Sequence, residues 1–81
     1  MYQYALALLL SITSQFISLE DYNKIEIGST SEFVHGLLGP SERVNWEKGD
    51  EICLLWEEDD QTVAVTFKKD RVIDKWEVGL Y

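Results

Sequence analysis

Side chains that commonly perform catalysis or bind metals are rare in this chain of 81 residues. His35 is the only histidine and Cys53 the only cysteine, so neither has a second ligand of its kind at metal-binding spacing. No serine or cysteine has a histidine placed to activate it as a nucleophile, because His35 is expected alone on the surface of a helix. No glycine-rich phosphate-binding loop is present either. The sequence therefore predicts a protein without enzymatic activity, without a metal and without a cofactor.

The densest group of acidic side chains is the run from Glu57 to Asp60. It could attract calcium, but it lacks the alternating oxygen ligands and central glycine of an EF-hand loop, so we interpret it as a solvated hairpin tip. The whole chain has 15 acidic and 7 basic residues and a formal net charge of −8. This balance argues against nucleic acid as a partner, because phosphate binding needs clustered lysine and arginine. It fits a basic protein partner, or a charge that serves solubility.

Residues 1–17 form an apolar segment that includes the run Ala5 to Leu10. About 20 apolar residues are needed to span a bilayer, so we expect no stable membrane span. Two interpretations stay open. The segment has the length of a signal-peptide hydrophobic region, although no Lys or Arg precedes the run and no A-x-A site follows it. It could instead be a retained helix that packs on the domain or on a second copy as a homo-oligomer, in a cytoplasmic rather than an exported protein.

Residues 18–81 are predicted to form one domain of the α+β class, which opens with two short helices. The first covers about residues 19–25 and is capped by Ser18. The second starts at Ser29, which lies three residues before Glu32 in the spacing of a capping box. Together they predict a helix–loop–helix layer in front of the strands.

The Gly39-Pro40 pair predicts the end of the second helix, because glycine adopts the left-handed cap conformation and proline cannot continue a helix. Inside the helix, Gly36 lowers the stability of the helix by about 1 kcal/mol relative to alanine. We therefore interpret Gly36 as a position where a neighbouring element approaches the helix closely. The helix also carries one apolar stripe that must lie on another layer, formed by Phe33, Val34, Leu37 and Leu38.

Four strands of an antiparallel meander are predicted after the helices, at about residues 43–47, 51–57, 62–68 and 71–79. Gly49-Asp50, between the first two strands, suits a two-residue type II′ turn. That turn pairs Trp46 with Cys53 and Val44 with Leu55.

The predicted registers separate the sheet into two faces. If the loop from Glu58 to Gln61 has four residues, one face is strongly apolar and is where the helices should lie: Ile52, Leu54, Trp56, Val63, Val65 and Phe67. The opposite face is too apolar for a plain solvent face and carries Val44, Trp46, Cys53, Leu55 and Ala64. Contiguous apolar surface of this kind marks an interaction site.

Among the three tryptophans, Trp56 and Trp76 are expected in the core, whereas Trp46, next to a protruding hairpin, is the expected contact with a partner. Cys53 is expected to act as a small core hydrophobe. We therefore predict a partner-binding site on the free sheet face and the first hairpin, formed by Val44, Trp46, Lys48, Gly49, Asp50 and Leu55.

The order and spacing of several short pieces resemble a known family. The pieces are Tyr22-Asn23-Lys24-Ile25, Ile27-Gly28-Ser29, Leu38-Gly39, and Val65-Thr66-Phe67 to Val72. Over about Leu19 to Leu80 the chain is similar to the β-lactamase-inhibitor-protein-like domains, a group that includes small bacterial outer-membrane lipoproteins of the SmpA/OmlA type. The resemblance implies a helix–loop–helix on one face of a four-stranded antiparallel sheet, with the other face free to bind protein.

The resemblance also implies a role for Asp50. Inhibitors of this group place a hairpin-borne Asp in the active site of the target enzyme, whereas the lipoprotein members act in envelope assembly. The chain departs from the family pattern at its last turn, where Lys69-Asp70 replaces Asp-Gly or Asn-Gly, so we expect a turn that is slightly strained or longer. Cys53 has no partner for a hairpin disulfide, and without a lipobox cysteine we expect no lipid anchor.

The leading hypothesis is a non-catalytic protein-binding module of bacterial envelope or secreted type. The alternative is an acidic inhibitor or decoy that blocks a basic enzyme surface through its charge. Salt separates the two hypotheses, because binding by a charge-driven decoy weakens steeply with ionic strength and binding by a hydrophobic anchor does not.

Overall fold

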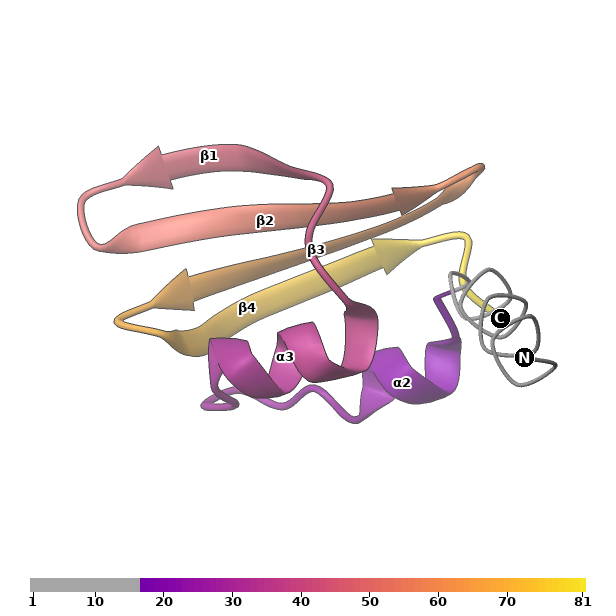
Figure 1. Ribbon diagram of the computed structural model, residues 1–81, viewed down its shortest axis with the longest axis horizontal. Coiled ribbons are helices and arrows are strands. Elements are labelled where there is room, and N and C mark those ends of the chain that lie inside the picture. Colours follow the sequence, from indigo (N-terminus) through magenta and orange to yellow (C-terminus); the bar gives the residue numbers. More distant parts are fainter. Residues whose placement is uncertain (1–16) are drawn as a thin grey trace, which may run out of the picture.

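A four-stranded antiparallel sheet with two short helices on one face makes up the structure, a computed structural model that describes residues 17–81 (Figure 1). The α+β meander predicted from the sequence is confirmed, with strand order β1-β2-β3-β4. Within residues 17–81, no helix is long and apolar enough to cross a membrane. The predicted roles of the N-terminal segment, including the homo-oligomer contact, fall outside the described residues except at Ile17. The elements are α2 (Leu19–Asn23), α3 (Ser31–Leu38), β1 (Arg43–Lys48), β2 (Glu51–Glu58), β3 (Gln61–Lys68) and β4 (Arg71–Val78).

Each helix begins at a side-chain cap, but α3 begins one residue later than its sequence pattern predicts. Ser18 caps α2 as expected, with its Oγ accepting a backbone N–H of the first turn at 3.0 Å. Thr30 caps α3, with its Oγ1 3.1 Å from the backbone N of Phe33. The predicted capping box is therefore wrong, and the Oγ of Ser29 instead accepts the N–H of Glu26.

Pairing of the loop before α3 with the edge of β4 explains this shift. The N–H of Gly28 donates to the backbone O of Val72, and the N–H of Val72 donates to the backbone O of Ser29, both at 2.8 Å. The backbone of Ser29 is thus part of the sheet edge, and Thr30 is the next residue that can cap a helix. At its other end α3 stops at Gly39, which has a φ of 80°, as predicted.

The first hairpin has the predicted two-residue loop, but β1 contains one extra residue. The loop glycine has a φ of 63°, the positive value that the first position of a type II′ turn requires. Trp46 pairs with Cys53 as predicted, and a β-bulge then shifts the register between Val44 and Trp46. Val44 pairs with Leu54, so the predicted pairing with Leu55 is wrong. Because Leu54 packs against the helix-covered core, Val44 leaves the opposite face.

The other two hairpins are equally tight. The predicted register of β2 and β3 is confirmed, with Trp56 opposite Val63, but the loop has two residues, Asp59-Asp60, and not four. In the last turn both residues of Lys69-Asp70 have positive φ, 49° and 70°, and the turn is not lengthened. Ser31 of α3 holds this turn, because its N–H donates to the backbone O of Asp70 and its Oγ to the Asp70 carboxylate.

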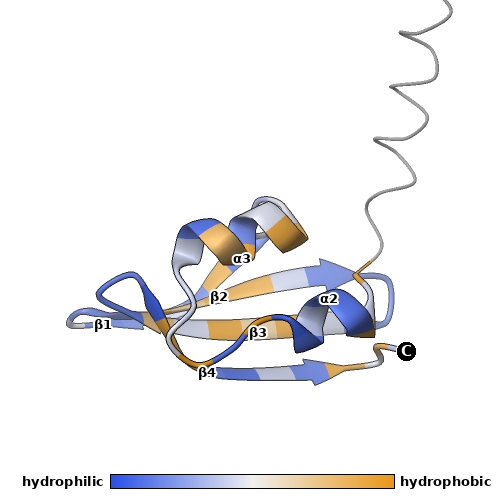
Figure 2. Ribbon diagram, turned by 90° about the horizontal axis from the view of Figure 1, so that it is seen from below, coloured by the Kyte–Doolittle hydropathy of each residue, from blue (hydrophilic) through white to orange (hydrophobic). Residues whose placement is uncertain are grey.

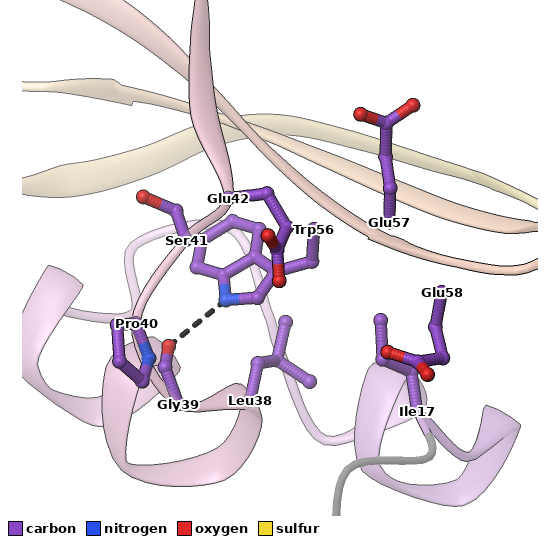
Figure 3. A pocket seen from close by; sticks show the side chains of 9 residues that line it. All are labelled: Ile17, Leu38, Gly39, Pro40, Ser41, Glu42, Trp56, Glu57 and Glu58. Atoms are coloured by element: carbon purple, nitrogen blue, oxygen red, sulfur yellow. Dashed lines mark hydrogen bonds between the residues drawn. The ribbon is translucent and has the colours of Figure 1, made fainter.

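The main hydrophobic core lies between the helices and the sheet face that was predicted for them (Figure 2). Val65 of β3 and Val34 of α3 are completely buried there. The indole N–H of Trp56 donates to the backbone O of Gly39 at 2.9 Å and so joins β2 to the end of α3 (Figure 3). The predicted helix stripe is confirmed except at Phe33, which is exposed.

His35 packs at the boundary of helix and sheet, although the sequence predicts it on the helix surface. Its ring centroid lies 5.6 Å from that of Trp56 and 6.4 Å from that of Phe67. Its Nδ1 is 2.8 Å from the backbone O of Ser31, so this polar atom of the half-buried ring has a partner within the helix. The surface prediction is wrong, and His35 is a packing residue.

Gly36 is a position where alanine should stabilise the domain. A Cβ added there would meet nothing within 4 Å, so the predicted close approach is wrong. Because alanine is about 1 kcal/mol better than glycine inside a helix, we expect Gly36→Ala to raise Tm by roughly 4–8 °C in thermal unfolding followed by circular dichroism. Gly39→Ala is the control, since the positive φ of Gly39 should make alanine destabilising there. A lower Tm for Gly36→Ala would contradict this interpretation.

Candidate protein-binding surface

Within residues 17–81, neither helix covers the second face of the sheet, which we call the free face (Figure 2). Strand alternation directs every second side chain of β2 and β3 to it. Its centre is nevertheless buried, because Cys53, Leu55 and Ala64 form a small cluster separate from the main core. The edge strands β1 and β4 flank this cluster, so their side chains shield it.

A β-bulge in β4 decides which of its side chains reach the free face. After a register shift, Trp76 pairs with Ala64. Lys75 points to the helices instead, where its Nζ donates to the backbone O of Tyr22 at 2.9 Å and lies 4.1 Å from the centre of the Tyr22 ring. Burial in this contact lowers the pKa of Lys75 and raises the pKa of Tyr22. Trp76 therefore faces away from the main core, and its predicted core position is wrong.

Two half-exposed tryptophans flank the free face, Trp46 on β1 and Trp76 on β4. They are 42% and 43% exposed, against 2% for Trp56 in the main core. Trp46 pairs with Cys53 and Trp76 with Ala64, so each indole stands beside the small buried cluster. Accessible aromatic side chains next to a packed centre are the usual anatomy of a binding hot spot.

Exposed apolar side chains continue along β4. Ile73 is the extra residue of the bulge, and Val78 pairs with Thr62 on the free face. The sequence pattern misses Trp76 because of this bulge. If the residues on either side of the Lys69-Asp70 turn are paired one by one without a bulge, Trp76 falls opposite Val63 of the main core. The same count places Asp74 in the core as well, and a buried carboxylate without a partner is the signal that could have revealed the shift.

The residues predicted for the site occupy three different places. Trp46 lies on the free face and is accessible to a partner. Leu55 also belongs to this face but is 4% exposed, so it supports its neighbours rather than offering contact area. The tip from Lys48 to Asp50 is exposed, and Val44 pairs on the helix-covered side.

Polar groups also occur on the free face and at its hairpin turns. Arg43 and Glu57 form an exposed ion pair, with Nε–Oε1 at 2.8 Å and Nη2–Oε2 at 3.3 Å, and this hydrogen bonding raises the pKa of Arg43. The N–H of Lys69 donates to the backbone O of Asp50 at 3.4 Å, which ties the hairpin tip to the last turn. A rim of this kind around an apolar centre is typical of protein interfaces.

The comparisons with known proteins agree with this geometry. A family model described as β-lactamase inhibitor (BLIP) matches residues 18–81, which contain both helices and all four strands. Comparisons with curated proteins and with solved structures give no match. The free face and the hairpin tip lie entirely within the matched part of the chain.

Proposed function

The chain belongs to the β-lactamase inhibitor (BLIP) family through residues 18–81, and from this premise we propose that it binds and blocks a β-lactamase without catalysis of its own. The free face and the hairpin tip from Lys48 to Asp50 form the contact in this proposal. The place of action is the bacterial envelope or the medium outside the cell, where a protein of this type would meet such an enzyme.

The pair of half-exposed tryptophans carries the proposal. A tryptophan offers 150–250 Å² of rigid surface at a small cost in conformational entropy, which is why it dominates binding hot spots. Trp46 and Trp76 stand on opposite edges of one face, so a single partner surface laid across the strands can contact both. Their common face, and not the helix layer, is therefore where we place the partner.

Asp50 supplies the second part of the contact. It stands exposed at the tip of the first hairpin, and its backbone is held by the last turn. Penicillins and cephalosporins carry a carboxylate, so an enzyme that binds them presents donors or cations complementary to that charge. We infer that the Asp50 carboxylate occupies this position when the hairpin tip enters the active site.

Asp50→Ala is expected to weaken inhibition of a β-lactamase at least about tenfold, because a hydrogen bond to a charged group is worth about 1.5–3 kcal/mol. The full-length protein is titrated into the purified enzyme, and hydrolysis of a chromogenic cephalosporin is followed. Glu47→Ala is the matched control, since it removes the same charge from the same hairpin on the helix-covered face, opposite Ile52.

Three outcomes are distinguishable in this assay. A loss confined to Asp50→Ala supports the proposed contact. Equal losses in both variants would assign the inhibition to the acidity of the domain as a whole, as in the decoy hypothesis. Full inhibition by both variants would remove the Asp50 carboxylate from the contact.

A further inference from the structure

The turn between β3 and β4 has a backbone conformation that its own residues do not favour. Lys69 and Asp70 both have positive φ, 49° and 70°, which is the pattern of a type I′ turn. A Cβ crowds the backbone in this conformation, so Asn-Gly is the pair that usually forms such a turn. Strained residues of this kind persist where the surrounding structure holds them. Because this turn contains no glycine, a contact from elsewhere in the domain has to hold it.

Ser31, the first residue of α3, supplies that contact. Its N–H donates to the backbone O of Asp70 at 3.0 Å, and its Oγ donates to the Asp70 carboxylate. Its own backbone O lies 2.8 Å from Nδ1 of His35. The ring of His35 packs in turn on Trp56 and Phe67. All three polar groups of Ser31 are therefore used, and together they join the last turn to the main core.

The same turn holds the tip of the first hairpin. Figure 1 shows both turns at one end of the sheet, and the N–H of Lys69 donates to the backbone O of Asp50 at 3.4 Å. Within residues 17–81, no other backbone hydrogen bond joins the Gly49-Asp50 turn to a different part of the chain. The strand before this tip, β1, lies at the edge of the sheet and is exposed along its whole length. Packing therefore gives the tip little support, and the order of Asp50 depends on the last turn.

We propose that Ser31 positions Asp50 through the last turn. The hydroxyl of Ser31 holds the Asp70 carboxylate, which keeps the turn in its left-handed conformation. The Lys69 N–H then stays directed at the backbone O of Asp50. A contact group that is ordered beforehand binds more tightly, because it loses less conformational entropy on binding. The coupling is a property of the free domain, and its effect on affinity rests on the proposed contact of Asp50 with a β-lactamase.

Relaxation measurements on the ¹⁵N-labelled full-length protein test the coupling without an enzyme. Ser31→Ala keeps the backbone N–H and loses only the hydroxyl. We expect it to lower the order parameter of the Asp50 amide from about 0.85 to below about 0.6. The affinity for a β-lactamase, measured by inhibition of cephalosporin hydrolysis, should fall about three- to tenfold, the effect of one additional group ordered on binding. Ser31→Thr, which retains a hydroxyl, should restore both values.

Two further variants separate the Ser31 hydroxyl from the stability of α3. Thr30→Ala removes the N-cap of α3 but not the contact with Asp70, so it should lower Tm and leave the order parameter of Asp50 unchanged. Lys69→Asn/Asp70→Gly introduces the pair that a type I′ turn prefers and keeps the net charge. In that background the turn holds its own conformation, so Ser31→Ala should no longer affect the tip.

Several results would overturn the proposal. One is an unchanged order parameter of Asp50 in Ser31→Ala, and another is an equal fall in Thr30→Ala, which would assign the effect to the stability of α3. A third is the same effect of Ser31→Ala in the Asn-Gly background. If the tip loosens in Ser31→Ala while inhibition stays at the wild-type level and Asp50→Ala weakens it, Ser31 does not position the contact. A looser tip combined with no effect of Asp50→Ala on inhibition would support the coupling and contradict the proposed contact.

Discussion

Replacing Trp76 with alanine is expected to weaken binding to a β-lactamase about 30- to 700-fold, because truncating a tryptophan hot spot costs about 2–4 kcal/mol. The free energy of unfolding should fall by only about 1 kcal/mol or less, because the indole is already 43% exposed and stands outside the main core. Calorimetric titration measures the affinity, and thermal unfolding measures the stability of the same preparation.

Phe33→Ala is the matched control for this prediction. Phe33 is 46% exposed, like Trp76, but it lies on α3 across the sheet from the free face. Its truncation should leave the affinity within about twofold of wild type. Leu55→Ala should behave in the opposite way to Trp76→Ala and lose about 2–5 kcal/mol of stability, because Leu55 is buried. Equal loss of affinity in Phe33→Ala and Trp76→Ala would contradict a specific role for the free face.

Gly79→Ala is expected to destabilise the domain by about 2–4 kcal/mol, which corresponds to a fall in Tm of roughly 10–25 °C. Two costs combine at this position. Gly79 has a φ of 83°, and a Cβ added there would lie 2.5 Å from the backbone O of Asp60. That oxygen belongs to the tight turn between β2 and β3, so it cannot rotate away as the end of a side chain could.

Gly28→Ala separates the two costs of Gly79→Ala. Gly28 has a φ of 96°, but an added Cβ would meet nothing within 4 Å, so only the backbone strain of about 1–2 kcal/mol applies. Denaturant unfolding of the two variants gives the difference directly. Equal losses would show that Asp60 moves aside without cost and that the close contact at Gly79 does not hold the turn.

The hairpin turns on either side of β2, together with the alternation of apolar and polar side chains along β3, were sufficient to predict which face of the sheet the helices cover. Gly49 accepts a positive φ cheaply, and so it determines the register at the tip of the first hairpin. Val63, Val65 and Phe67 then alternate so strictly that a slip of one residue would expose all three. Pairing residues outward from Gly49 also places Trp46 opposite Cys53, so the positions of Trp46 and of the hairpin tip were predictable.

The β-bulge at Asn45 leaves no signal in the local pattern, and the one at Ile73 is indicated only by the carboxylate of Asp74, which a regular strand would bury. Each inserts one residue and moves the following side chains to the other face. In β4 the bulge keeps Asp74 out of the core and places Trp76 on the free face. It also lets Lys75 reach Tyr22 of α2, a contact between residues 53 positions apart that no local window contains.

The start of α3 was misplaced for a related reason. Ser29 and Thr30 are both good capping residues, and local preference does not choose between them. The choice is made by the edge of β4, which pairs with the backbone of Ser29 through Val72. A hollow lined by Ile17 and Gln61 was likewise invisible in the sequence, because the chain before α2 meets the start of β3 only through packing of the helix layer on the sheet.

The indole N–H signals of the three tryptophans test the central claim most directly, that the free face is the binding surface. The ¹⁵N-labelled, deuterated protein is mixed with an unlabelled β-lactamase, and the protons of the enzyme are saturated. Trp46 and Trp76 should lose indole intensity, whereas Trp56, whose N–H is held by the backbone O of Gly39, should keep it. Attenuation confined to the helix layer, with both exposed indoles unchanged, would contradict the claim.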